Sequence, residues 1–217
     1  MLFGAVPRSV WFNLRWLPWS QAVKMPVWIA PNVRVKNMWR GGFVLKDARF
    51  NSCHIGFHCA DAVDGYGVHT IICINPGGRW FVDGDLHIGR GAIINVNSGG
   101  ELRTGRNFAI SGTTSIICSK TISIGGDVQF SWNSLVMDSD AHKVFGVDGE
   151  WINKPADVTI GNKVWIAANT TIMKGSVIGD NCVVAGNSVV NKAHRETGCV
   201  LAGMPAKKVK DISGWEI

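Results

Sequence analysis

The chain has 217 residues, of which 46% are hydrophobic and 18% are charged, and it carries a net charge of +6. This composition excludes a disordered chain and allows a domain with a substantial buried core. The basic excess is not clustered enough for a nucleic acid partner, and no RNA-binding or zinc-finger motif accompanies it. It suits an anionic cofactor, an anionic substrate or a lipid surface instead.

Residues 1–30 form an aromatic and basic segment. Its tryptophans and cations are Trp11, Trp16, Trp19 and Trp28, with Arg8, Arg15 and Lys24. Prolines and charges interrupt every apolar run, and none reaches the length of a membrane span. Two interpretations stay open, a cap over the end of a solenoid and an amphipathic segment at a bilayer interface. They are compatible if the substrate is linked to a lipid.

Residues 31–85 are expected to form irregular β coils, in which "NVRVKNMW" and "GGFVLKDARF" indicate short strands. The stretch "CHIGFHC", from Cys53 to Cys59, combines cysteines and histidines. Structural zinc sites separate their ligand pairs, however, and adjacent side chains of an extended segment point to opposite faces. We therefore expect buried thiols and ordinary histidines here, and no metal. No secretory signal precedes the six cysteines, so we expect them to be reduced.

A repeat of six residues dominates the stretch from Ile160 to Val190. An aliphatic residue opens each hexad, at Ile160, Ile166, Ile172, Ile178, Val184 and Val190. Four positions later comes a compact residue, at Val164, Thr170, Ser176, Cys182 and Ser188. A period of six fits neither a helix nor a single strand. It predicts a three-sided coil in which each hexad is one side, the aliphatic residue points inward, and stacked turns share one core.

The same spacing extends toward the N-terminus. Ile124, Phe130 and Val136 keep it, as do the pairs Ile88–Ile94 and Leu102–Phe108, with steps of eight residues between such pairs. The dipeptide Ile-Gly recurs at positions 88, 124, 160 and 178. These intervals would be whole numbers of turns if every turn held three hexads. The longer steps predict that some sides are wider.

The spacing breaks at His142, which takes the next inward position after Val136. A polar loop, 143–157, follows before the repeat resumes at Ile160. Asp138, Asp140 and His142 are two residues apart, so an extended strand would place them on one face. A carboxylate beside an imidazole fixes its tautomer and makes the other ring nitrogen more basic, which predicts a general base.

The Ile160–Val190 array and the closing segment "VLAGMPAKKVKDI" resemble the hexapeptide-repeat acyltransferases, and "DSDAH" resembles a pattern of their polysaccharide O-acetyltransferases. The resemblance implies an all-β, left-handed parallel β-helix over residues 86–199, a tail over 200–217, and a homotrimer with active sites between protomers. It also implies that His142 removes a proton from an acceptor hydroxyl, which attacks acetyl-CoA directly. Asp140, or alternatively Asp138, would orient the imidazole.

The same resemblance assigns the coenzyme A groove. Two residues would line the pantetheine arm, Trp165 and Ala168. Three would meet the pantetheine and the pyrophosphate, Gly186, Asn191 and Lys192. Two would face the nucleotide phosphates, Lys207 and Lys210.

We therefore expect an acetyl-CoA-dependent O-acetyltransferase that acts on a sugar hydroxyl in surface polysaccharide biosynthesis. It would work in the cytoplasm, and the membrane interpretation of the N-terminal segment would add a peripheral contact to the inner face of the membrane. Two alternatives stay open. One is an acetyltransferase for a small acceptor such as a free sugar, a serine or an amine. The other is a non-catalytic β-helix that serves as a scaffold or resembles a carbonic anhydrase.

Overall fold

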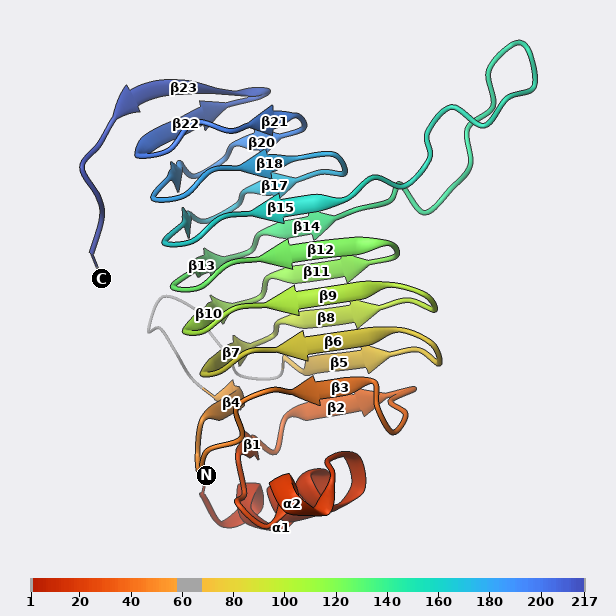
Figure 1. Cartoon of the computed structure of the whole chain (residues 1–217), viewed down its shortest axis with the longest axis vertical. Helices are drawn as coiled ribbons and strands as arrows, with labels where there is room; N and C mark the ends of the chain where they lie inside the picture. Colours follow the sequence, from red (N-terminus) through yellow and green to blue (C-terminus); the bar gives the residue numbers. More distant parts are fainter. Residues whose placement is uncertain (1, 58–67, 217) are drawn as a thin grey trace.

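The computed structural model describes residues 2–57 and 68–216, and its main body is a three-sided coil of short strands stacked in parallel (Figure 1). Side A contains β1 (Val27–Ile29), β4 (Cys53–Phe57), β7 (Leu86–Arg90), β10 (Phe108–Gly112), β13 (Gln129–Trp132), β16 (Trp165–Ile166), β19 (Val183–Val184), β22 (Cys199–Gly203) and β23 (Ala206–Asp211). Side B contains β2 (Val33–Lys36), β5 (Thr70–Ile74), β8 (Ile93–Val96), β11 (Ser115–Cys118), β14 (Leu135–Met137), β17 (Thr171–Ile172) and β20 (Val189–Val190). Side C contains β3 (Phe43–Leu45), β6 (Arg79–Val82), β9 (Glu101–Thr104), β12 (Thr121–Ile124), β15 (Val158–Ile160), β18 (Val177–Ile178) and β21 (Ala193–His194).

The core is one continuous column of inward-facing side chains. Every aliphatic residue that opens a hexad between Ile160 and Val190 is buried, and so is every compact residue four positions later. The expected all-β fold, a parallel β-helix with an extruded loop, is confirmed. Parallel pairing starts at β1, so the described parts of residues 31–85, which are 31–57 and 68–85, already belong to the three-sided stack.

The turns differ in length along the coil. Ile160 pairs with Ile178 in the next turn, whereas Ile110 pairs with Ile88 before it and Phe130 after it, so the early turns hold more residues. The prediction that the intervals between Ile-Gly dipeptides are whole numbers of turns is therefore wrong for the early turns. Ile88 lies on side A and Ile124 lies on side C, because the wider turns shift the later dipeptide onto another side.

Corners of the coil are made by residues with left-handed backbone angles. Asn133 and Asn169 stack at the corner between sides A and B, with φ of 58° and 60°, and the Asn133 side-chain amide donates to Asn169 Oδ1 at 2.7 Å. Asparagine tolerates this conformation better than most residues, which explains its recurrence near the bends.

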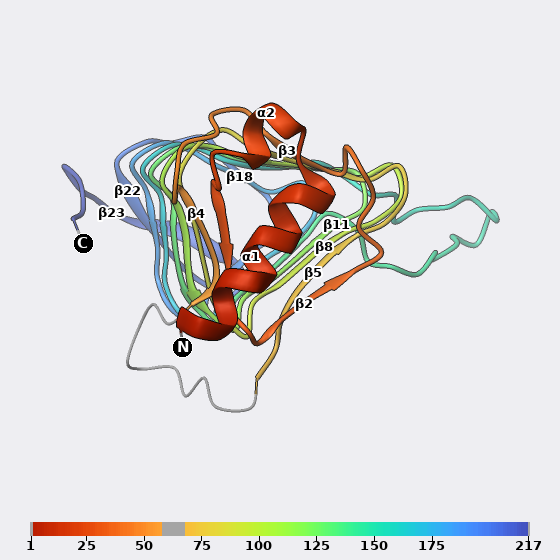
Figure 2. The ribbon, with the colours of Figure 1, turned by 90° about the horizontal axis from the view of Figure 1, so that it is seen from below.

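Two helices, α1 (Leu2–Trp16) and α2 (Trp19–Ala22), cover the N-terminal end of the coil (Figure 2). One face of α1 is buried, at Ala5, Ser9, Phe12 and Asn13. The Asn13 side chain accepts from Val27 N at 3.2 Å and donates to Val27 O at 2.6 Å. The cap therefore satisfies polar backbone groups of the first strand, which would otherwise lack partners. Among the described helices, none is long and apolar enough to cross a membrane.

The cysteines of the described residues are free thiols. Cys53 is buried on β4, and burial raises the pKa of its thiol to about 12. Its neighbour His54 is half-buried and contacts His87, with 3.3 Å between their Nδ1 atoms. His58 and Cys59, the other members of the "CHIGFHC" stretch, lie outside the described residues.

The extruded loop is an arm of residues 138–157 that leaves the corner between sides B and C and projects far from the coil (Figure 1). Its outgoing and returning limbs meet in an isolated antiparallel bridge between Phe145 and Trp151. The arm begins five residues earlier than the expected loop, 143–157, because β14 ends at Met137.

Candidate active site

Asp138 stands at the root of the arm and is fully buried. Its carboxylate accepts hydrogen bonds from the backbone N–H groups of Ser119 and Lys120, at 2.7 and 2.8 Å. Its carbonyl oxygen accepts from Ala156 N at 3.0 Å, which closes the base of the arm. Asp138 therefore holds a corner of the coil together, and both of its carboxylate oxygens are engaged away from the imidazole.

His142 lies on the arm and is exposed. The expectation that it fills an inward position of the coil is wrong, because Val136 is the last inward residue before the chain turns outward. Ala141 has a left-handed φ of 63°, which breaks the alternation that would place Asp138, Asp140 and His142 on one face. Within residues 2–57 and 68–216, no side chain hydrogen-bonds to the His142 ring.

Asp140 contacts two other groups. Its Oδ2 accepts from Lys174 Nζ at 2.5 Å and from the Asn153 side-chain amide at 2.9 Å. The hydrogen bond from Lys174, followed by that from Asn153, lowers the pKa of the Asp140 carboxyl below its ordinary value. The structure thus corrects the expected direct contact between Asp140 and the imidazole, because the carboxylate binds a lysine of the next turn.

Asn153 connects the two limbs of the arm around His142. Its amide nitrogen donates to His142 O at 2.8 Å, and its Oδ1 accepts from Val144 N at 2.7 Å and from Trp151 Nε1 at 2.8 Å. His142 N also donates to Asp140 O at 2.7 Å. The backbone on both sides of His142 is therefore fixed, while the side chain stays exposed.

Sequence reasoning missed Lys174 and Asn153. The position of Lys174 was readable, since it follows the inward Ile172 by two residues and lies at the corner from which the arm leaves. Asn153 carried no signal, because the arm has no repeat from which a contact across it can be inferred.

The residues expected to bind coenzyme A are distributed over several edges of the protomer. Trp165 is exposed on side A, and the strand register continues from it through Val183 and Val200 to Lys210. Trp165 and Lys210 therefore lie in one outward column, three strands and about 14 Å apart at the usual strand spacing. Lys207 lies on the same strand as Lys210 and is exposed.

The remaining expected cofactor residues occupy two corners. Ala168 and Gly186 stack at the corner between sides A and B, where a Cβ on Gly186 would lie 3.2 Å from Ala168 O. A side chain there would press on the backbone of the turn beneath. Asn191 and Lys192 are exposed at the corner between sides B and C, and Lys192 lies one turn beyond Lys174. They share this edge with the root of the arm.

A cleft of about 580 Å³ opens at the corner between sides C and A, lined in part by Gln129, Lys163 and Trp215. The Trp215 indole donates to Lys163 O at 2.8 Å and lies 6.2 Å from the Trp165 ring. The C-terminal segment therefore folds back along the coil and adds a second indole beside Trp165.

Comparison with known proteins shows the class to which this coil of short stacked sides belongs. The family "Bacterial transferase hexapeptide (six repeats)" matches residues 157–192. An uncharacterized 24.8 kDa protein in the cps region of Klebsiella pneumoniae is 30% identical over 99% of this chain and 89% of its own length. Galactoside O-acetyltransferase of Escherichia coli K12 is 32% identical over 53% of this chain and 56% of its own length.

Among solved structures, the polySia-specific acetyltransferase NeuO superposes with a TM-score of 0.58 at 20% identity, covering 88% of this chain and 89% of its own. That likeness shows a shared fold. This chain belongs to the hexapeptide-repeat acyltransferases, and its coil is their left-handed parallel β-helix. It spans about half the length of galactoside O-acetyltransferase.

Proposed function

We propose that the protein transfers an acetyl group from acetyl-CoA to a hydroxyl of a sugar in a surface polysaccharide or its precursor, with His142 as the general base. The observation that carries this proposal is the arm itself. It presents an imidazole that has no hydrogen-bond partner among the described residues, on a backbone that Asp140, Asn153 and Lys174 fix to the coil. The sugar acceptor is supported by the relative named for a galactoside.

The chemistry needs one base and no acyl-enzyme. The unprotonated nitrogen of His142 takes the proton of the acceptor hydroxyl, and the oxygen attacks the thioester carbonyl carbon. A backbone N–H at a coil corner would stabilise the resulting oxyanion. When the intermediate collapses, the C–S bond breaks and the departing thiolate takes the proton from the imidazolium. Asp140 is a positioning residue in this scheme, because it acts on His142 through the backbone.

We further propose that the protein is a trimer whose active sites lie between protomers. Side B supports this proposal, because its outward face carries aliphatic side chains where solvent contact would favour polar ones. Ile71 pairs with Ile93, and the same outward column continues through Ser115 to Leu135, so three of these four side chains are aliphatic. Burying this face against a neighbouring protomer would remove apolar area from water. It would also bring a second coil next to the arm, which leaves from the edge of side B.

The experiment that tests the proposal compares wild type with His142→Ala, using acetyl-CoA, a thiol reagent and a panel of nucleotide sugars and lipid-linked glycans. We expect turnover of the accepted sugar to fall by about 10²–10⁴-fold, with folding and acetyl-CoA affinity unchanged. His69→Ala is the matched control, because His69 is also exposed but lies on the coil. Wild-type turnover in His142→Ala would contradict the assignment, and no thiol release with any member of the panel would contradict the sugar acceptor.

A further inference from the structure

The cap has a second face that the coil does not use. Opposite the buried face of α1, four apolar residues are exposed: Val6, Val10, Trp11 and Leu14. Trp19, the first residue of α2, is 73% exposed and adds another indole to the same end of the molecule. The outer side of α1 therefore also carries apolar residues, although this side does not pack against the coil.

The positive charge of the protein is concentrated at this end. Residues 1–46, which contain the cap and the first turn, include seven lysines and arginines and neither aspartate nor glutamate. The rest of the chain holds all 16 acidic residues and nearly the same number of basic ones, so its charges almost cancel. The basic excess, which is not clustered enough to indicate nucleic acid, therefore lies mostly at the capped end of the chain.

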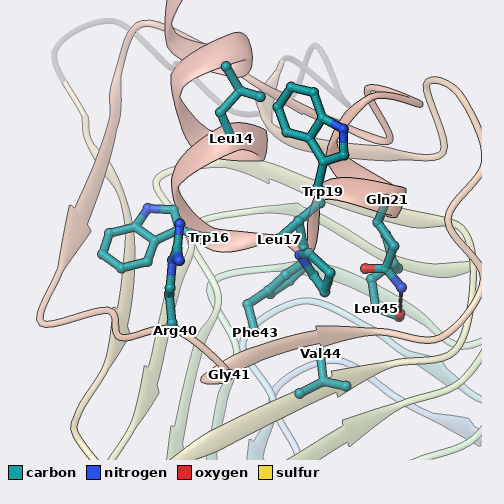
Figure 3. Close-up of a pocket in the computed structure, with 11 residues that line it drawn as sticks. Leu14, Trp16, Leu17, Trp19, Gln21, Arg40, Gly41, Phe43, Val44 and Leu45 are labelled. Atoms are coloured by element: carbon teal, nitrogen blue, oxygen red, sulfur yellow. Dashed lines mark hydrogen bonds between the residues drawn. The ribbon is translucent and has the colours of Figure 1, made fainter.

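Cations and apolar groups meet in a pocket of about 490 Å³ beside the junction of α1 and α2 (Figure 3). Leu14 and Trp19 lie on one side of this pocket and Phe43 on another, and Arg40 lies beside Trp16. Arg40 Nε donates to the Arg15 carbonyl oxygen at 3.3 Å, and the Arg15 guanidinium lies 4.8 Å from the centre of the Trp16 ring. Two guanidinium groups are thus held next to an indole of the cap.

We propose that the capped end docks on the surface of an anionic lipid bilayer. The exposed indoles would enter the interfacial region, where amphipathic aromatic rings are favoured, and Arg15, Arg40 and Lys24 would meet lipid phosphates. The helix lies on the bilayer and does not cross it, because its 15 residues are fewer than the roughly 20 that a span needs.

The positive charge of the capped end favours an anionic bilayer, rather than a second copy of the chain, as its partner. Two caps face to face would bring two groups of seven cations together, and of these seven Lys46 is paired with an acid, Asp83. An anionic bilayer offers both the apolar layer and the opposite charge. This inference goes beyond the proposed function, since it concerns where the protein binds and not which group it transfers.

The test is co-sedimentation of the full chain with vesicles of phosphatidylcholine alone and with equal parts phosphatidylglycerol, without acetyl-CoA. We expect binding to the anionic vesicles only, weakened by salt. Trp11→Ser/Trp19→Ser and Arg15→Gln/Arg40→Gln should each lower the partition coefficient by on the order of tenfold. All four residues are exposed, and thermal unfolding will verify the fold of each variant.

Two matched controls keep the result specific. Arg79→Gln/Arg106→Gln removes the same charge from exposed sites on the coil, and Met204→Ser/Val209→Ser removes exposed apolar groups at the opposite end. Both should bind anionic vesicles like wild type.

Equal binding by the cap variants and wild type, or binding to neutral vesicles alone, would overturn the proposal. Concentration-dependent association lost in the cap variants, without vesicle binding, would overturn it in favour of a second copy. Acetyl transfer to a soluble acceptor should be unchanged in every variant, which separates this test from the proposed function.

Discussion

Lys174 Nζ lies 2.5 Å from Asp140 Oδ2, and it also donates to Asn153 O at 2.8 Å. One lysine of the coil therefore binds both limbs of the arm, near its beginning and near its end. The lysine side chain is only 21% exposed and that of Asp140 is 32% exposed, so water competes less for this contact than for a surface ion pair. The position of His142 depends on this contact, since it lies between the two anchored residues.

Lys174→Met should lower kcat by on the order of 10²-fold while leaving the dissociation constant of acetyl-CoA unchanged. The reason is positional, because a small displacement of a catalytic group can cost this much. Lys154→Met is the matched control, since Lys154 is an exposed arm lysine with no ion pair among the described residues. Steady-state kinetics and an acetyl-CoA titration measure both quantities. An equal loss of activity in the two variants would show that Lys174 does not position the arm.

The contact between Asp140 and Lys174, which holds the arm to the coil, should be lost in acid. The folded-state pKa of Asp140 is lowered, first by Lys174 and then by Asn153, so its stabilisation is complete above the unfolded value of 3.8. It is lost as the pH falls through the lower folded value. We expect Asp140→Asn to increase amide exchange in residues 139–154 at about pH 6, and the difference from wild type to disappear once the pH has fallen through the lowered folded-state pKa. A difference that persists in strong acid would mean that the carboxylate charge does not hold the arm.

Asp138→Ala should destabilise the fold, in contrast to a catalytic substitution. The backbone N–H groups of Ser119 and Lys120 would lose a buried acceptor, which costs about 2–3 kcal/mol in unfolding free energy. Urea unfolding at neutral pH measures this loss. Asp148→Ala, in the exposed tip of the arm, should change stability little. If Asp138→Ala kept its stability but lost turnover, the residue would return to the catalytic group.

Replacing Lys207 and Lys210 with alanine should weaken acetyl-CoA binding more than it slows the chemical step. Both lysines are exposed on β23, and they would contact a remote part of the cofactor equally in the ground and transition states. The effect should shrink with salt, because exposed charges are screened within about 10 Å at 0.1 M ionic strength. Lys36→Ala/Lys46→Ala at the other end is the control. Unchanged affinity at low salt would remove these lysines from the cofactor site.

The fold could be predicted from the sequence where the same packing requirement applies to every turn. An aliphatic residue must face the core once per side, so Ile160, Ile166 and Ile172 predict three sides directly. The early turns obey the same rule with wider sides. Their register depends on which residues pair, and no local pattern encodes that, which is why Ile88 was aligned with the wrong side.

The candidate site was only partly readable. The break in the repeat located the arm and His142, because a missing inward residue is visible in the sequence. The partners of Asp140 were not, since Lys174 comes from the next turn and Asn153 from the returning limb. A single left-handed residue, Ala141, was enough to invalidate the assumption of one extended face.

The strands on either side of the arm pair as if it were absent. Ile122 lies opposite Val158 and Ile124 opposite Ile160, the same parallel register that joins turns without an insertion. Each turn contacts only its neighbours, so the pairing of the strands does not depend on the length of the arm inserted at this corner. The arm can therefore be lengthened, shortened or replaced during evolution without a change in the register of the coil.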